Sequence, residues 1–569
     1  MRIWPPDGAW GRAEMLNELL ASRRARAVIP VVLLAVFVSQ ASYIAWEKSS
    51  TWDEPTHLMS GYARLMGGDT RASMHHPALG QEMIAAPAAV FLALAFDKTI
   101  NPSYPNGRFF VSSVKFLYEN RVDARTLLFL ARLPNIILGA ILGLYVFLWS
   151  ESLWGASGAY LSLFFYSLSP DVLAHASLAT TDLSAAAFIF IAAFYLYRIY
   201  DRGADSAGAL AAGVGIGLAL SAKHTAVILA PFVLVTFAMR LKKDGARKTA
   251  VAFLYLSAAA YLVVWAVYGF RYQASVAPLP WDGFPPSALK AIFSLLKEIK
   301  FLPEAHLYSL AGTFAAGASG GAGFLMGGYS GTGWWYYFIT AFLIKTPVPT
   351  IFLVIAALLY GCRSSNSRGR AFALFLPVAV IFLLASLQKV NIGIRHILPV
   401  YPFLFTLIGF VPSIKTGSVR PARHVFGAAC VWYLYAAVSI FPHDLAYFNE
   451  FIGGPANGYK YLVDSNLDWG QDLRGLKEFM DANGIKNIKL AYFGLGDPRY
   501  YGIDYDYMPS YVIPEPGNVR ADIVLKGWFA VSATMLQGVY LPQRDFYRPF
   551  RETEPVAMIG YSIFVYRFD

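Results

Sequence analysis

Two adjacent carboxylates, Asp53 and Glu54, lie in a short polar string at residues 52–57, a few residues beyond the first long apolar segment. A carboxylate held at a lipid surface loses hydration, and this loss raises its basicity toward that of a general base. Solvated loop charges, with Pro55 ending a helix, would account for the same residues. Both interpretations are open, and the first predicts a proton acceptor at a membrane boundary.

Further polar residues are expected on the same side of the membrane. His75 and His76 stand before a proline, where they could ligate a metal, hold a phosphate or cap the next segment. Asp182 closes a short Thr-Thr-Asp loop, and a helix N-cap would explain it without any catalysis. Asp182 is nevertheless expected at the same membrane depth as Asp53, so the two carboxylates could share one site.

Three basic positions on this face stand beside apolar segments: Lys223, which precedes His224; Lys345; and Arg395, which precedes His396. A single Lys or Arg near a helix end usually extends its charged group to the interface. Three such positions on the face opposite the basic loops predict a cradle for an anion.

This set of groups suits the transfer of a sugar from a phosphate-linked carrier. The phosphate is already a reasonable leaving group, and it needs cations to hold its charge as the bond breaks. The incoming hydroxyl group needs a base. One carboxylate and a cationic cradle at the lipid–water boundary match a donor whose tail lies in the bilayer.

The composition indicates the elements that must position these residues. Of the 569 residues, 56% are hydrophobic and 15% are charged, and the net charge is +11. Soluble proteins have about 25% charged residues. These figures exclude a disordered chain, a soluble nucleic-acid binder and a disulfide-rich scaffold, and they predict an integral membrane protein. Neither Cys362 nor Cys430 is placed for a disulfide on the outer face.

About eleven apolar segments are predicted to span the membrane as helices, since each is near the ~20 residues that a bilayer requires. They are residues 28–45, 127–149, 153–169, 183–200, 208–222, 225–239, 249–270, 336–360, 371–387, 397–411 and 424–441. Arginines before the first segment predict a cytoplasmic N-terminus, and the Lys- and Arg-rich loops at 240–248, 362–370 and 415–423 then fall in the cytoplasm too.

This topology divides the chain into three parts. Residues 1–27 are a cytoplasmic or interfacial N-terminus, residues 28–442 a transmembrane domain, and residues 443–569 a small extracytoplasmic α/β domain. The outer loops of the transmembrane domain are residues 46–126, 170–182 and 271–335. The α/β domain is predicted to contain a helix at 473–483 and strands at 487–493, 522–525 and 561–568.

Two other stretches have competing explanations. The Gly-rich tract at residues 312–333, followed by Trp334 and Trp335, could be a flexible connector with an interfacial aromatic belt or a mobile lid. The acidic string at residues 464–472 is similar to a calcium-binding loop, but its glycine is one place late and no Glu closes it. A helix cap fits that string better.

Taken together, these strings resemble the membrane glycosyltransferases of the GT-C superfamily, in particular bacterial relatives of protein O-mannosyltransferases and of the aminoarabinose transferases of lipid A. The matching strings are residues 52–54, 76–79, 180–182, 221–224, 345–347, 395–399 and 464–472. They cover nearly the whole chain in a consistent order. The His-Pro-Pro-Leu motif of the family is His-Pro-Ala-Leu here, and Gln81 replaces the lysine that often follows.

The resemblance implies roles for the acidic residues. Asp53 is expected to be the catalytic base, Glu54 a helper or metal contact, and Asp182 the second acidic position. The donor in such families is a polyprenyl-phosphate sugar, and transfer inverts the anomeric centre. The expected acceptor is a hydroxyl group of a protein, a lipid or a glycan, and the transferred group is hexosyl or pentosyl.

The resemblance also implies contacts with the donor. The expected phosphate-binding residues are Arg395, Lys345, Lys223 and His396. Contacts with donor or acceptor are expected from His57, His75, His76, Trp334 and Trp335. Some relatives use a divalent metal and others do not, and the candidate ligands here are Glu54, His57, His76 and His306.

Two other classes of protein compete with the enzyme. A transporter or flippase should place its polar residues near the bilayer midplane, often on broken helices in repeated halves, and no repeat is visible. An assembly or receptor protein would leave Asp53 and Asp182 without a shared role. The sequence therefore predicts a multi-pass glycosyltransferase of the bacterial inner membrane with extracytoplasmic catalytic loops and no nucleic-acid partner.

Overall fold

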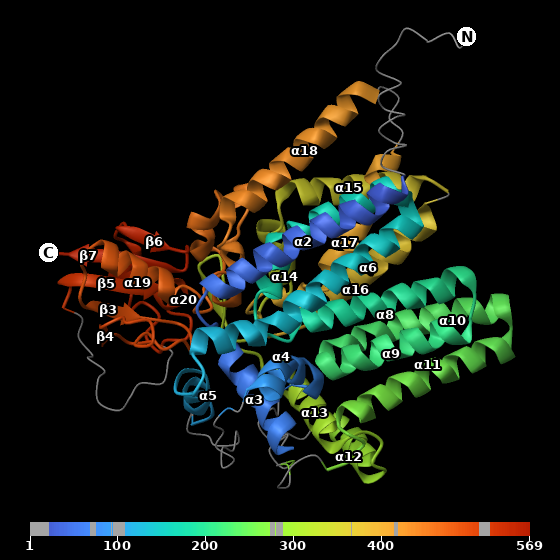
Figure 1. Cartoon of the computed structure of the whole chain (residues 1–569), viewed down its shortest axis with the longest axis horizontal. Coiled ribbons are helices and arrows are strands. Elements are labelled where there is room, and N and C mark those ends of the chain that lie inside the picture. The colour runs from blue at the N-terminus through green and yellow to red at the C-terminus, as the bar shows by residue number, and fades with distance from the viewer. Residues whose placement is uncertain are drawn as a thin grey trace.

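The computed structural model describes residues 22–68, 76–92, 94, 108–273, 279, 281, 288–365, 367–414, 419–510 and 524–569. Its helices form one large bundle, and a small domain with a sheet lies at one end of the bundle (Figure 1). The predicted fold class, a helical membrane protein with a small C-terminal α/β domain, is confirmed.

Within the described residues, six helical segments are long and apolar enough to cross a membrane. They are α2 (Arg23–Glu47), α6 (Ala124–Ser167), α8 (Asp182–Arg202), η2 with α10 (His224–Asp244), α11 (Ala246–Val267) and α16 (Arg368–Ser386). Other helices of the described part are α5 (Arg108–Tyr118), α9 (Ser206–Ala222), α17 (Val400–Ile408) and α18 (Val419–Ile440). The predicted number of about eleven spans stays a prediction.

Three predicted spans have a different form in the structure for local reasons. The predicted span at residues 336–360 is bent, because α14 (Tyr337–Lys345) and α15 (Val348–Arg363) meet at an angle of 111°. Pro347 separates them, and the residue before a proline is kept out of the helical region. The predicted spans at 127–149 and 153–169 are joined in α6, whose non-helical residue is Gly155 with φ of 78°.

Shorter elements lie at the end of the bundle that carries the predicted outer loops (Figure 1). They are α3 (Glu54–Gly67), α4 (Ala78–Phe91), α7 (Pro170–Ala176), α12 (Ala288–Glu298) and α13 (Glu304–Ser319). The Gly-rich tract forms the end of α13 and a hairpin of β1 (Gly323–Leu325) and β2 (Gly328–Ser330). The hairpin contacts the C-terminal domain, since Tyr329 Oη donates to the carbonyl of Gln537 at 2.6 Å.

The C-terminal domain contains a five-stranded sheet in the order β4-β3-β5-β7-β6. The strands are β3 (Ile488–Ala491), β4 (Tyr505–Tyr507), β5 (Gly527–Ser532), β6 (Ala557–Ile559) and β7 (Ile563–Phe568). Strand β3 pairs in parallel with β4 and β5, and β7 pairs antiparallel with β5 and β6. The amphipathic helix α19 (Leu473–Ala482) packs Leu473, Leu476 and Met480 into the same apolar cluster as β3 and β5.

Most elements of this domain agree with their predictions. The helix predicted at 473–483 and the strands predicted at 487–493 and 561–568 are present with shorter ends. The strand predicted at 522–525 is wrong: residues 524–526 are irregular and the strand starts at Gly527, while residues 522 and 523 lie outside the described part. Short helices α20 (Ala533–Leu536) and α21 (Arg548–Arg551) and several 3-10 turns complete the domain.

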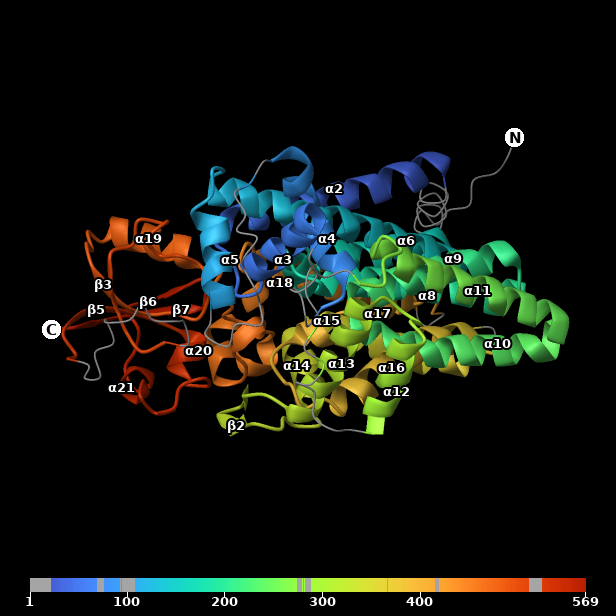
Figure 2. The same ribbon diagram turned by 90° about the horizontal axis from the view of Figure 1, so that it is seen from below.

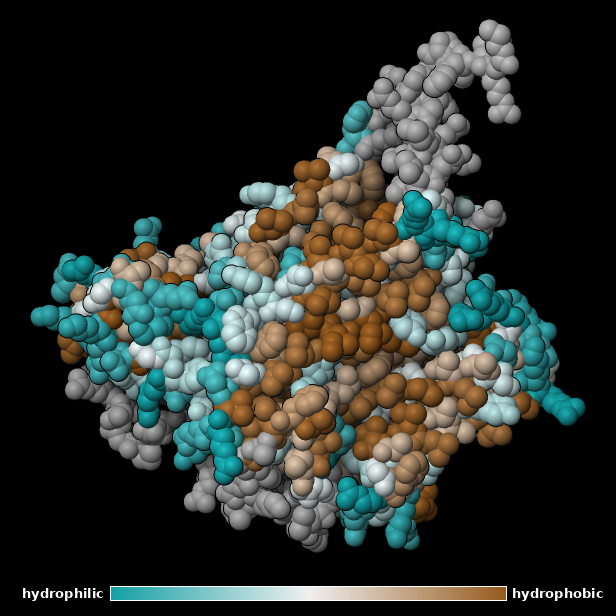
Figure 3. Space-filling view, in the orientation of Figure 1, coloured by the Kyte–Doolittle hydropathy of each residue, from teal (hydrophilic) through white to brown (hydrophobic). Residues whose placement is uncertain are grey.

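The surface is divided in the way a membrane protein requires. Figure 3 shows a broad hydrophobic band over the middle of the bundle, with hydrophilic residues over the C-terminal domain and at the opposite end. The view from below places the C-terminal domain at one end of the helices as well (Figure 2). That opposite end carries the basic turns between α10 and α11 and between α15 and α16. The orientation in the membrane and the domain boundaries stay predictions.

Candidate active site

Four charged side chains from distant parts of the chain form a row of alternating charges. Arg395 Nη1 donates to Asp53 Oδ2 at 2.6 Å and lies 3.7 Å from Asp182 Oδ2. Lys223 Nζ donates to the other carboxylate oxygen of Asp182. The row is therefore Lys223, Asp182, Arg395 and Asp53, with two acids and two cations.

Each member of this row stands at the end of a helix. Asp53 is the N-cap residue of α3, and Asp182 is the first residue of α8. Lys223 is the C-cap residue of α9, and Arg395 lies in the 3-10 turn η4 (Ile394–Ile397) before α17. Because these ends meet on one side of the bundle, the site is at the boundary of the apolar band rather than in its middle.

The burial of the four side chains differs in a way that matters for chemistry. Asp182 is 1% exposed, Arg395 11%, Lys223 17% and Asp53 24%. Asp182 is thus enclosed between two cations, whereas Asp53 is the most accessible carboxylate of the row. Burial lowers the pKa of Arg395, but Asp53 and Asp182 raise it by more, so Arg395 keeps its charge.

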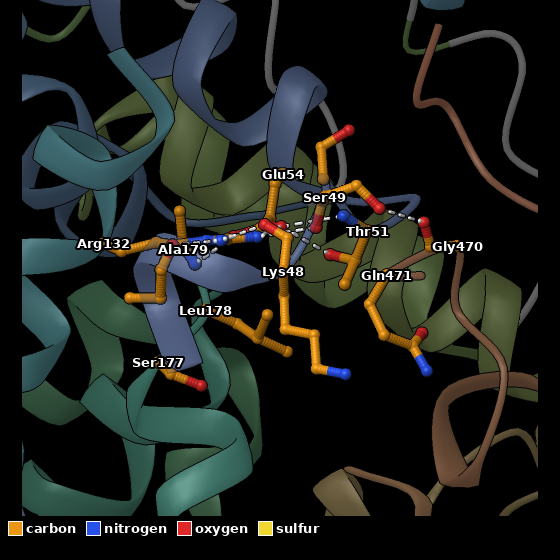
Figure 4. Close-up of polar contacts among 12 residues, drawn as sticks. Lys48, Ser49, Thr51, Glu54, Arg132, Ser177, Leu178, Ala179, Gly470 and Gln471 are labelled. Carbon is orange, nitrogen blue, oxygen red and sulfur yellow. Dashed lines mark hydrogen bonds and ion pairs between the residues drawn. The ribbon is translucent and has the colours of Figure 1, made fainter. Parts of the chain in front are cut away.

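Glu54, the neighbour of Asp53, does not face this row. It is fully buried and forms an ion pair with Arg132 of α6, whose Nε and Nη2 donate to its two oxygens at 2.7 and 2.6 Å. The backbone N–H groups of Thr51 and Ala179 donate to Glu54 as well (Figure 4). The expected role of Glu54 as a catalytic helper or metal contact is therefore corrected, because its oxygens are already occupied.

Lys345 also has a different role from the one expected. It is 1% exposed, and its ammonium group donates to the carbonyl oxygens of Leu445, Tyr447 and Asn466 at 3.0, 2.9 and 2.6 Å. An ammonium group has three donors, and all three are used. Lys345 therefore joins the end of α14 to the C-terminal domain and is not available to hold a phosphate.

Two of the expected histidines lie close to the row and are uncharged. Burial lowers the pKa of His57, and the amide nitrogen of Gln81 lies 3.0 Å from its Nδ1 atom. Burial lowers the pKa of His396 to about 3, and its ring stacks on Phe338 with centroids 5.8 Å apart. Both can take part as neutral hydrogen-bonding groups but add no charge.

The remaining aromatic and histidine candidates are less central. His76 packs edge-to-face on His57 with centroids 4.9 Å apart, and His75 lies outside the described residues. The backbone N–H of Trp334 donates to Asn391 Oδ1 at 2.6 Å, near η4 in the chain, whereas Trp335 is 68% exposed.

The candidate metal ligands do not come together. Glu54 is paired with Arg132, His57 contacts His76, and His306 packs against His224 with centroids 5.0 Å apart. In the part of the chain that the structure describes, no group of three or more His, Cys, Asp or Glu side chains is placed to hold a metal ion. These residues do not fit a metal site, and no catalytic step is assigned to one.

The sequence interpretation missed several residues. Arg132 interrupts an apolar run, and an ionisable residue inside a membrane segment could have been recognised as a structural or functional signal. Arg64 of α3 is 7% exposed; its Nε atom lies 3.7 Å from Glu82, and its Nε and Nη1 atoms have no hydrogen-bond partner among the described residues. Trp469 lies under Arg395, with the guanidinium carbon 4.2 Å from the ring centroid.

Part of this architecture matches a known family. Residues 126–269 match the family model of dolichyl-phosphate-mannose-protein mannosyltransferase, which is about a quarter of the chain. The segment runs from α6 to the end of α11 and includes Asp182 and Lys223. The resemblance to protein mannosyltransferases is confirmed over this segment.

Two solved structures are similar to this chain. The crystal structure of ArnT from Cupriavidus metallidurans bound to undecaprenyl phosphate has 14% identity and a TM-score of 0.46, over 94% of this chain and 97% of that chain. The crystal structure of the Archaeoglobus fulgidus oligosaccharyltransferase in the apo form has 13% identity and a TM-score of 0.41, over 72% and 55%. No curated protein matches the chain significantly. No residue role is transferred from these structures, because both the identity and the TM-score are low.

Proposed function

We propose that this protein is a glycosyltransferase that uses a polyprenyl-phosphate sugar and transfers the sugar to a hydroxyl group on the extracytoplasmic face of the bacterial inner membrane, with inversion. The observation that carries the proposal is the row of Lys223, Asp182, Arg395 and Asp53 at the boundary of the apolar band. The transferred group is a hexosyl or pentosyl group.

Asp53 is the base in this proposal. It is the most exposed carboxylate of the row, and its Oδ2 atom forms an ion pair with Arg395. The acceptor hydroxyl oxygen attacks the anomeric carbon from the face opposite the phosphate, and Asp53 takes the hydroxyl proton. The bond from the anomeric carbon to the phosphate oxygen breaks, and its electron pair leaves with the polyprenyl phosphate.

The cations hold the phosphate as its charge increases. The Nε atom of Arg395 is buried and has no hydrogen-bond partner among the described residues, so one donor of this guanidinium group is available. Lys223 and the neutral His396 complete the contacts.

Asp182 has a supporting role in this scheme. Since it is 1% exposed and lies between Lys223 and Arg395, it is unavailable to an acceptor and instead fixes both cations. Two cations without Asp182 would repel each other in a site of low dielectric constant. Asp182 therefore keeps the cradle assembled before the donor arrives.

The position of the row favours an enzyme over a transporter. A transporter needs its binding residues near the midplane, where both faces can open to them in turn. Here the charged groups stand at helix ends, and Arg395 contacts Trp469 of the C-terminal domain. A site open to one face suits a reaction between a lipid-borne donor and an acceptor on that face.

The test compares Asp53→Asn with Asp123→Asn in cells that lack the gene. Asp123 is an N-cap residue too, of α6, and it lies outside the row, so it is a matched control. Mass spectrometry of envelope glycans and glycoproteins measures the product. We expect Asp53→Asn to abolish the product at normal protein levels and Asp123→Asn to retain it. Full product formation by Asp53→Asn would refute Asp53 as the base.

A further inference from the structure

One segment of the C-terminal domain, residues 464–472, contacts both sides of the Asp53–Arg395 ion pair. The ring of Trp469 lies 4.2 Å from the guanidinium carbon of Arg395. The carbonyl oxygen of the same residue accepts a hydrogen bond of 2.9 Å from the backbone N–H of Trp52, which directly precedes Asp53. Trp469 is 1% exposed, so its position is fixed by packing.

The segment holds the backbone that leads into Arg395. Asn466 Oδ1 accepts from the N–H of Ile394 at 2.9 Å, and Ser465 Oγ donates to the carbonyl of Ile392 at 2.8 Å. Between them, Gly393 packs so closely on Ser465 that a Cβ atom would overlap the Ser465 hydroxyl. The turn that carries Arg395 therefore has little freedom to move away from the segment.

The segment also holds the chain that leads into Asp53. The N–H of Ser49 donates to the carbonyl of Gln471 at 3.0 Å, and Ser49 Oγ donates to the carbonyl of Gly470 at 3.0 Å (Figure 4). The side chain of Gln471 stiffens the segment itself, because its Oε1 accepts from the N–H of Trp469 and its Nε2 donates to the carbonyl of Leu467.

We infer that Trp469 is a positioning residue that sets the distance and orientation between Asp53 and Arg395, so that the C-terminal domain is a working part of the active site. This inference rests on the proposed function of the Asp53–Arg395 pair. The guanidinium carbon lies over the indole ring at 4.2 Å from its centroid, a contact that an arginine favours and a lysine cannot match in the same way. The in-plane donors stay directed at Asp53 and at the phosphate.

The charge of a second residue in the segment, Asp464, also acts on Arg395. Asp464 is 7% exposed, has a positive φ of 57° and accepts hydrogen bonds from the N–H of Ser465 and from Tyr540 Oη. Its carboxylate interacts with Arg395 without direct contact, since no ion pair links them. Asp464 therefore attracts the guanidinium group of Arg395 from within the segment and does not compete with Asp53 for its donors.

The test uses Trp469→Leu with Trp528→Leu as the matched control. Trp528 lies in the same domain and also faces an arginine, with Arg567 5.5 Å from its ring centroid, but it belongs to β5, outside the segment. Product per amount of protein in the membrane is measured by mass spectrometry of the envelope. We expect Trp469→Leu to lose about tenfold, consistent with one cation–π contact in a desolvated site, and Trp528→Leu to lose none.

A double-mutant cycle separates positioning from general packing. In an Arg395→Lys background the contact between guanidinium group and indole ring is absent, so the further loss from Trp469→Leu is expected to shrink to less than twofold. Equal losses in both backgrounds, or a loss that only follows the protein level, would overturn the inference. If Trp469→Leu does not accumulate, Trp469→Phe takes its place in the same cycle under the same criterion.

A binding measurement keeps this inference distinct from the proposed function. The purified full-length protein is titrated with a polyprenyl phosphate in detergent, and the shift in its unfolding temperature is recorded. We expect the shift to be smaller for Trp469→Leu than for Trp528→Leu, because the Arg395 donors are misdirected. Equal shifts would count against positioning, whereas an envelope unchanged by loss of the gene would count against the proposed function itself.

Discussion

Replacing Glu54 by Gln distinguishes two neighbouring carboxylates that the sequence alone treats alike. Glu54 is fully buried, and its oxygens accept from Arg132, from the backbone of Thr51 and from the backbone of Ala179. A glutamine has nearly the same shape, but it presents an NH2 group where Glu54 presents an acceptor. The variant removes the negative charge. Its NH2 group would also face one of the N–H donors that now bind Glu54.

The expected loss of stability follows from what stays buried. Arg132 is 0% exposed and donates to the carbonyls of Ala45, Lys48 and Ser49 as well as to Glu54. Its charge would lose its ion-pair partner among the residues that the structure describes. Removing one member of a buried pair costs about 3–5 kcal/mol, because the other charge is left uncompensated. The loss of two or three hydrogen bonds to a charged group gives a decrease in the free energy of unfolding of the same size.

The assay measures the unfolding of the purified protein in detergent together with product formation in cells. Glu54→Gln is expected to lower stability by about 3–5 kcal/mol, and to lower the product only as far as the protein level falls. Asp53→Asn is the control, with the reverse expectation: stability close to that of the natural protein and no product. If Glu54→Gln were as stable as the natural protein but inactive, Glu54 would act in the chemistry and the reasoning would be refuted.

Two further predictions concern other buried charges. Lys345→Met should destabilise the protein by about 3 kcal/mol, because three buried carbonyl groups lose their donor. The binding of polyprenyl phosphate by the folded fraction should be unchanged. Weakened binding at normal stability would instead assign Lys345 to the phosphate. Burial raises the pKa of Asp468 to about 7. The folded state then retains a proton that the unfolded state releases at about pH 4, so this contribution to stability is present at low pH and is lost as the pH rises toward 7. Unfolding measured from pH 5 to 8 should therefore show a steeper loss for the natural protein than for Asp468→Asn, and parallel curves would contradict the raised pKa.

The sequence by itself was sufficient for the class of protein and for the row of charges. Apolar segments near the length of a bilayer predict a membrane bundle, and the polar composition after residue 443 predicts a separate domain. Asp53, Asp182, Lys223 and Arg395 each stand where an apolar segment starts or ends. Since such ends on one side of a membrane share the same depth, residues more than 300 positions apart could be expected to meet.

Only the tertiary structure decided which of the similar residues face that site. Asp53 and Glu54 are adjacent, yet one faces the row and the other turns into the bundle toward Arg132. Lys345 and Lys223 both end apolar segments, but one is enclosed by three carbonyl groups and the other reaches Asp182. The contacts of Trp469 likewise depend on how the C-terminal domain packs on the bundle. Burial and the identity of a long-range partner arise from packing between distant segments, and the local spacing of residues does not determine them.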